Sequence, residues 1–161
     1  DEARKLRWFG LQKGVSRTEV DITRAGFKYN MNNVAGVIGL HQLTDIDNAI
    51  DRHVRNGMIF DSAFRNVSGV TPARVSPQAR PSYWLYTLLC DDAADVERKL
   101  TAAGVAASKL HRPNHLHSVF ARFRRPLPQL EEFYRRLVHI PCGWWVSDED
   151  RERIVEVVKA G

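Results

Sequence analysis

The chain has 161 residues, of which 43% are hydrophobic and 27% are charged, and its formal net charge is +5. This length suffices for one domain, or for one domain with a piece of another. Apolar runs are too short for a membrane span, no signal-peptide pattern opens the chain, and two cysteines are too few for a disulfide scaffold. We therefore expect a cytoplasmic protein without a membrane anchor. Because the chain starts at Asp1 without an initiator Met, we also expect it to be part of a longer protein.

The first half of the chain has mainly helical patterns. Residues 1–13 indicate a helix, and residues 15–29 alternate only loosely. The strongest helical signal follows, because apolar residues recur at near-helical intervals after a run of asparagines that suit an N-cap. Gly57 suits the end of this helix. We therefore expect a helix over about 32–56, which is long enough to connect two lobes.

The second half is predicted to alternate between strands and helices. Three prolines make residues 68–82 a loop or an extended connector. The elements expected after it are a strand over 83–90, a helix that begins at Asp91 or Asp92 and closes at Gly104, a strand over 105–110, a helix over 127–137 and a last helix capped by Ser147. This order favours a small α+β domain with helices on one face of a short sheet.

Two segments carry candidate functional residues, GFKYNM at 26–31 and HRPNHLH at 111–117. Taken by themselves, the asparagines around the first segment are helix caps. The histidines of the second segment are either surface residues or, together with Cys142, zinc ligands. Their spacing matches no familiar zinc pattern, and no carboxylate lies among them. The zinc interpretation is therefore the weaker one, and surface histidines without a chemical role are the usual alternative.

Four segments in chain order resemble the DegT/DnrJ/StrS family of pyridoxal-phosphate-dependent nucleotide-sugar aminotransferases. They are GFKYNMNNVAGVIGLHQL, YWLYTLL, HRPNHLHSVF and IPCGWWVSDEDRERIV. The resemblance implies an α+β fold, the C-terminal small domain of the type I pyridoxal-phosphate transferase fold, with a long lobe-connecting helix and a short sheet covered by helices. Residues 1–31 would then be the tail of the large cofactor-binding domain, 32–57 the connecting helix and 58–161 the small domain.

The resemblance also implies a cytoplasmic homodimeric enzyme that uses pyridoxal 5'-phosphate to transfer an amino group from glutamate to a nucleotide-linked keto-sugar. In this family an asparagine of the first segment reaches the cofactor phosphate of the neighbouring subunit. Asn30 is the best match by position, and Lys28 stands where other members carry that asparagine. His117 best matches the recurrent histidine of the sugar-nucleotide pocket. Further candidate substrate contacts are His111, Arg112 and Asn114.

The lysine that would form the Schiff base with the cofactor is expected upstream of Asp1. The six lysines of the chain lie either in charged helices or in segments that do not carry it in the family. The chain alone is therefore expected to be inactive. Two other functions are compatible with the residues: a non-catalytic piece that dimerises or binds nucleotide-sugar, and a basic nucleic-acid-binding module. No nucleic-acid motif supports the second, so we expect neither nucleic acid nor membrane among the partners.

Overall fold

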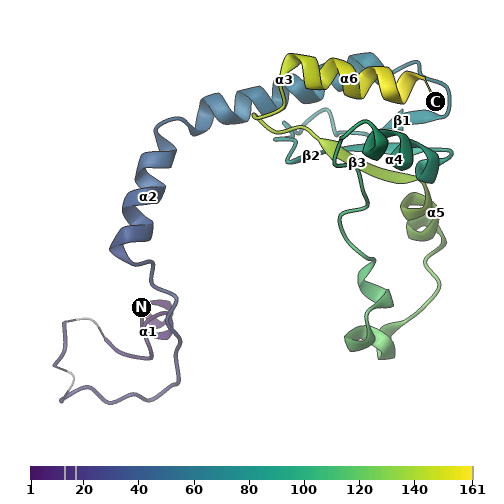
Figure 1. Cartoon of the computed structure of the whole chain (residues 1–161). Coiled ribbons are helices and arrows are strands. Elements are labelled where there is room, and N and C mark those ends of the chain that lie inside the picture. The colour runs from purple at the N-terminus through teal and green to yellow at the C-terminus, as the bar shows by residue number, and fades with distance from the viewer. Residues whose placement is uncertain (13, 17, 161) are drawn as a thin grey trace. The chain divides into compact units, whose positions relative to one another are not determined.

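The structure, a computed structural model, describes residues 1–12, 14–16 and 18–160. The chain divides into two compact units, Asp1–Ile46 and Asp47–Gly161. The first unit holds helices α1 (Glu2–Leu6) and α2 (Asn33–Leu43), and the second holds the sheet and the other helices (Figure 1). The domain limits expected at residues 31 and 57 stay a prediction.

Helix α1 ends at Leu6 instead of continuing through residue 13 as predicted. Phe9 and Gly10 adopt positive φ angles of 56° and 80°, and a left-handed residue interrupts α-helical hydrogen bonding. The chain then returns beside its own start. The amide of Phe27 donates to the carbonyl of Leu6 at 2.8 Å, and the amide of Phe9 donates to the carbonyl of Phe27 at 3.1 Å.

The single helix predicted over 32–56 is two helices in the structure. Helix α2 ends at Leu43, and α3 spans Ile46–Phe64. Between them, Thr44 donates its hydroxyl and its amide to the carbonyl of His41 at 2.7 and 3.2 Å. Bonds of this short range tighten and close the last turn of α2. The prediction of one long connecting helix is therefore wrong.

The two signals that delimit the predicted helix have different outcomes. Asn32 is the N-cap of α2 and accepts a hydrogen bond from the amide of Ala35 at 2.8 Å, which confirms the capping prediction. Gly57 lies inside α3 and does not end it. A Cβ on Gly57 would lie 2.5 Å from ring carbons of Tyr83. Packing against this ring, and not helix termination, is therefore the reason for a glycine here.

The second unit contains an antiparallel sheet in the order β1-β2-β3, with β1 at Val70–Pro72, β2 at Leu85–Cys90 and β3 at Leu137–Pro141. Strand β2 confirms the strand predicted over 83–90. Strand β3 is not predicted from the sequence. Residues 105–110, all of them described, form no strand and make one isolated bridge, from Ser108 to His139.

Three helices, α3, α4 (Ala93–Ala102) and α6 (Asp148–Lys159), cover one face of this sheet (Figure 1). The side chains of β2 alternate, so that Tyr86, Leu88 and Cys90 are buried against these helices. Phe60 and Phe64 of α3 stack with ring centroids 5.6 Å apart in the same core. The predicted arrangement of helices on one face of a short sheet is confirmed.

The remaining helices of this unit begin close to the predicted positions. Asp92 caps α4 by accepting from the amide of Asp95 at 2.9 Å, and Ser147 caps α6 by accepting from the amide of Asp150 at 3.0 Å. Helix α5 (Pro128–Arg136) confirms the helix predicted over 127–137. None of the helices in the described part of the chain is both long and apolar enough to cross a membrane.

Candidate functional site

Asn30 lies on the wall of a cavity in the first unit. The amides of Tyr29 and Asn30 both donate to the carbonyl of Arg7, at 2.9 and 3.2 Å. These bonds place Asn30 beside a cavity of about 520 Å³. Its other lining residues are Asp1, Arg4, Lys5, Arg7, Trp8, Leu11 and Gln12.

The lining of this cavity is cationic. Arg4, Lys5 and Arg7 face a single acidic side chain, that of Asp1. Arg4 and Asp1 lie 3.7 Å apart, but both side chains are more than two thirds exposed, so this ion pair is weak. The cavity therefore presents guanidinium, ammonium and amide donors, which are the groups that bind phosphate in proteins. The phosphate of pyridoxal phosphate fits this donor set.

Lys28, the other expected cofactor residue, has a different environment. Its ammonium lies 3.5 Å from the centroid of the Trp8 ring, in a cation–π contact, and the two residues also form an isolated β-bridge. Lys28 does not line the cavity, whereas Trp8 does. The structure therefore separates the two candidates: Asn30 borders the cavity, and Lys28 packs on a residue of its wall.

None of the lysines that the structure describes is buried. Lys99 pairs with Asp95 at 2.7 Å, and Lys109 donates to the carbonyl of Arg135 at 3.4 Å. Lys13 lies outside the described residues. A Schiff-base lysine needs a lowered pKa, which burial supplies. The described lysines lack that burial.

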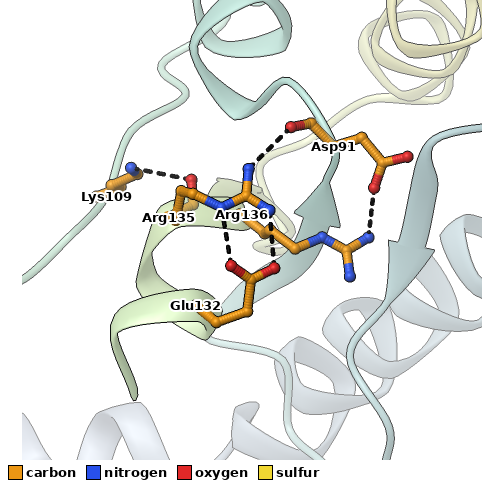
Figure 2. Close-up of polar contacts among 5 residues, drawn as sticks. All are labelled: Asp91, Lys109, Glu132, Arg135 and Arg136. Carbon is orange, nitrogen blue, oxygen red and sulfur yellow. Dashed lines mark hydrogen bonds and ion pairs between the residues drawn. The ribbon is translucent and has the colours of Figure 1, made fainter. Parts of the chain in front are cut away.

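The histidine segment belongs to a loop, residues 110–127, that leaves the sheet and returns through α5 (Figure 1). The loop contains two short 3₁₀ helices, η1 (Asn114–Leu116) and η2 (Ser118–Phe123). Figure 2 shows the polar contacts that α5 makes with Lys109, which immediately precedes this loop, and with Asp91 in the turn after β2. Arg135 donates to both carboxylate oxygens of Glu132, at 2.7 and 2.8 Å, and to the carbonyl of Asp91 at 3.3 Å.

These contacts connect α5 to the rest of the unit. Arg136 donates to the carboxylate of Asp91 at 2.8 Å, next to the bond that Asp91 accepts from Arg135 (Figure 2). The hydrogen bond from Arg135 holds the pKa of the Glu132 carboxyl below its ordinary value, and the same pairing raises the pKa of Arg135. Both groups are therefore charged at neutral pH, and hydrogen bonds from Arg135 and Arg136 to Asp91 hold the C-terminal end of α5 to the turn after β2.

His111 lines a groove of about 400 Å³ on the open side of the sheet. The groove is also bordered by Arg74, Trp84, Thr87 and His139, among others. His139 accepts a hydrogen bond from the amide of Leu110 at 3.2 Å, and burial lowers its pKa. Its ring is therefore neutral at pH 7, as that acceptor role requires.

The other three expected substrate residues, Arg112, Asn114 and His117, are exposed on the loop and lie outside this groove. The structure thus brings Asn114 and His117 together at the two ends of η1 and leaves His111 at the sheet. Which of these side chains contacts a substrate stays a prediction.

Sequence reasoning misses two features of the loop. Arg124 donates from Nε to the carbonyl of His115 at 3.2 Å and from Nη2 to the carbonyl of Leu116 at 3.0 Å. The Nδ1 atom of His115 is enclosed, and it has no hydrogen-bond partner among the described residues. The only signal in the sequence is the basic cluster at 122–125, which by itself indicates a solvated surface.

Cys142 does not share a site with the histidines. It is fully buried, its Sγ lies 3.6 Å from the carbonyl of His53, and burial raises its pKa to about 12. Among the described residues, no group of three or more His, Cys, Asp or Glu side chains could hold a metal ion. The zinc alternative has no support here, and the prediction that Cys142 packs in the core is confirmed. Trp144 and Trp145, in contrast, are 50% and 55% exposed.

The profile of the DegT/DnrJ/EryC1/StrS aminotransferase family matches residues 1–159. The chain belongs to this family. Its fold is similar to that of the sugar aminotransferase CalS13 from Micromonospora echinospora, with a TM-score of 0.93 and 34% identity over 98% of this chain and 43% of that chain. AtS13 from Actinomadura melliaura gives a TM-score of 0.94 and 31% identity, over 99% of this chain and 43% of that one.

Among curated relatives, the spore coat polysaccharide biosynthesis protein SpsC of Bacillus subtilis (strain 168) is 25% identical over 150 residues, which cover 86% of this chain and 39% of SpsC. The chain thus spans about two fifths of the length of such DegT/DnrJ/EryC1/StrS-family proteins. The fold class that the sequence resemblance implies is confirmed.

Proposed function

We propose that the full-length DegT/DnrJ/EryC1/StrS-family protein is a pyridoxal-phosphate-dependent aminotransferase that transfers an amino group from glutamate to a nucleotide-linked keto-sugar. The observation that carries this proposal is the likeness to CalS13, a sugar aminotransferase, at 34% identity and a TM-score of 0.93 over 98% of the chain. The cationic cavity beside Asn30 supports it independently, because it offers donors for a phosphate.

In this proposal the first unit helps to bind the cofactor phosphate of the neighbouring subunit in a homodimer. Asn30 donates from its side-chain amide, and Arg4, Lys5 and Arg7 neutralise the phosphate charge. Lys28 orients Trp8 in the cavity wall through its cation–π contact. When bound, pyridoxal phosphate supplies the electron sink that amino-group transfer requires. The Schiff-base lysine comes from a part of the protein outside this chain.

The loop of the second unit is proposed to bind the nucleotide-linked sugar. Arg112 presents a guanidinium, which binds diphosphate oxygens in a bidentate way. Asn114, His117 and His111 present amide and imidazole groups that suit sugar hydroxyls. All four side chains are accessible on the loop or at the sheet groove.

A homodimer is proposed from the surface of α2. No residue of this helix is buried. Five of its apolar side chains are each at least 54% exposed, those of Val34, Val37, Ile38, Leu40 and Leu43. Exposed apolar side chains in this number on one helix favour an interaction site. Light scattering on the full-length protein should give twice the mass of one polypeptide, and a strictly monomeric mass would contradict this part of the proposal.

We further propose that the enzyme acts in the cytoplasm.

The decisive experiment uses the full-length protein with pyridoxal phosphate, glutamate and a set of nucleotide-linked keto-sugars. Mass spectrometry should detect an amino-sugar nucleotide and 2-oxoglutarate in equal amounts. Binding of the nucleotide-sugar without turnover would instead indicate a non-catalytic role. In contrast, the chain Asp1–Gly161 mixed with pyridoxal phosphate and borohydride should give no stoichiometric adduct, because its described lysines are not buried.

The phosphate contact is tested by Asn30→Ala in the same protein. Loss of a charge-assisted hydrogen bond should raise the dissociation constant of pyridoxal phosphate by about tenfold or more. Asn33→Ala is the matched control, because Asn33 is exposed in the first turn of α2 and does not line the cavity. Equal cofactor affinity in the two variants would remove Asn30 from the site.

A further inference from the structure

Arg124 connects the two short 3₁₀ helices of the 110–127 loop. It is the C-cap residue of η2, and its guanidinium reaches back to the carbonyls of His115 and Leu116 at 3.2 and 3.0 Å. These carbonyls belong to the last two residues of η1. The carbonyls at a helix C-terminus have no partner within the helix, and a cationic side chain is a favourable partner for them.

The loop has little else to stabilise its shape. No residue of 110–127 is buried, and η1 has only three residues, a length at which 3₁₀ hydrogen bonds contribute little. Two backbone bonds close η1, from the amide of Leu116 to Pro113 and from the amide of His117 to Asn114, at 3.0 and 3.1 Å. A surface turn held by so few contacts opens readily. The two bonds from Arg124 are therefore a large share of the interactions that order it.

The bonded carbonyls lie between Asn114 and His117 in the chain. The backbone that Arg124 contacts is therefore the backbone that sets the distance and orientation of these two side chains. The loop contains four arginines and no acidic residue. Arg124 thus has no carboxylate within the loop to pair with, and its guanidinium binds the main chain instead.

We propose that Arg124 is a positioning residue for substrate binding, which stabilises η1 so that Asn114 and His117 face the nucleotide-linked sugar together. This inference rests on the proposed function of the loop. Arg124 acts through the backbone of η1 and makes no contact with the substrate. Because its two donors reach two different carbonyls, the planar fork of an arginine suits this role better than the single ammonium of a lysine.

The chain offers two matched controls. Arg122 and Arg125 carry the same charge in the same loop, yet neither has a hydrogen bond or ion pair to the described residues. Arg122 only packs over the ring of Phe123, 4.6 Å from its centroid. If only the charge of the loop matters, replacing any of the three arginines should weaken substrate binding equally. If Arg124 positions the loop, only its replacement should weaken binding.

The test uses the full-length holoenzyme and the variants Arg124→Met, Arg124→Lys, Arg122→Met and Arg125→Met. Arg124→Met should raise KM for the nucleotide-linked keto-sugar by about tenfold, as expected when an ordered turn becomes largely open. The half-reaction with glutamate should not change, because this amino acid carries no nucleotide. Arg124→Lys should restore part of the affinity, and the two control variants should match the wild type.

Hydrogen exchange supplies a readout that is independent of substrate. In Arg124→Met, the amides of Leu116 and His117 should exchange faster than in the wild type and in Arg122→Met. Equal exchange in these two variants, or faster exchange with an unchanged KM, would overturn the inference. If the wild-type holoenzyme transfers no amino group to any nucleotide-linked keto-sugar, the proposed function itself fails, and the role of Arg124 in substrate binding fails with it.

Discussion

Replacing Asn56 with leucine is expected to lower the free energy of unfolding of the second unit by about 3 kcal/mol. Asn56 is 4% exposed, and its side chain accepts from Arg151 at 2.9 Å and donates to the carbonyl of Gly143 at 3.0 Å. Arg151 is itself only 7% exposed. A leucine of similar size would therefore leave a buried guanidinium N–H and a buried carbonyl without partners, and their desolvation is no longer compensated.

The partner variant separates this cause from a simple packing defect. Asn56→Leu combined with Arg151→Met should recover only part of the lost stability, because it removes the unpaired guanidinium while the carbonyl of Gly143 still lacks its donor. Arg153→Met on the same helix is the control. Its pair with Asp150 is about half exposed and should contribute less than about 1 kcal/mol.

Hydrogen exchange at the amides of β2 in the full-length protein measures these changes, since those amides exchange by opening of the core. If Asn56→Leu costs no more than Arg153→Met, the buried network does not stabilise the unit. A double variant that is less stable than Asn56→Leu would show that packing, and not the unpaired polar groups, causes the loss.

Gly57→Ala is expected to destabilise the second unit by about 2 kcal/mol, although alanine is the better helix former by about 1 kcal/mol. The new Cβ would lie 2.5 Å from ring carbons of Tyr83. This ring cannot move freely, because its hydroxyl donates to Asp61 at 3.0 Å and the Tyr83 carbonyl lies 2.9 Å from Nδ1 of His53. The overpacking therefore outweighs the gain in helix propensity.

The environment of Tyr83 also indicates that the steric cost of the new Cβ exceeds the gain in helix propensity. Burial, together with the hydrogen bond to Asp61, raises the pKa of Tyr83 to about 12, so the phenol stays a donor at neutral pH. Its φ of 46° already lies in the left-handed region, which costs a non-glycine residue on the order of 1 kcal/mol or more. Tyr83 therefore packs its ring against Gly57 from a strained backbone conformation.

A double-mutant cycle tests the prediction. In a Tyr83→Ala background, Gly57→Ala should stabilise the unit by up to about 1 kcal/mol, because only the helix propensity remains. The same hydrogen-exchange measurement at β2 reports both steps. A loss of stability from Gly57→Ala that persists without the Tyr83 ring would contradict the steric explanation.

Several features of this protein follow from the sequence by itself. The caps Asp92 and Ser147, the alternation of β2 and the helix before Leu137 are encoded within a few residues, because capping and side-chain periodicity act over one turn or one pleat. The order of four short motifs likewise identifies the family. The resemblance singles out Asn30, whereas the cationic cavity beside it is seen only in the structure, and its contact with a phosphate stays a prediction.

The features that the sequence leaves open depend on residues far apart in the chain. In the sequence Gly57 indicates a helix end, but in the structure it provides space for the Tyr83 ring. Strand β3 is defined by its pairing with β2, which lies about 50 residues earlier in the chain. Arg124 has the appearance of surface charge until the loop folds back to the carbonyls of His115 and Leu116. Pairing, packing and contact with a distant carbonyl leave no periodic trace in the sequence, so only the tertiary structure decides them.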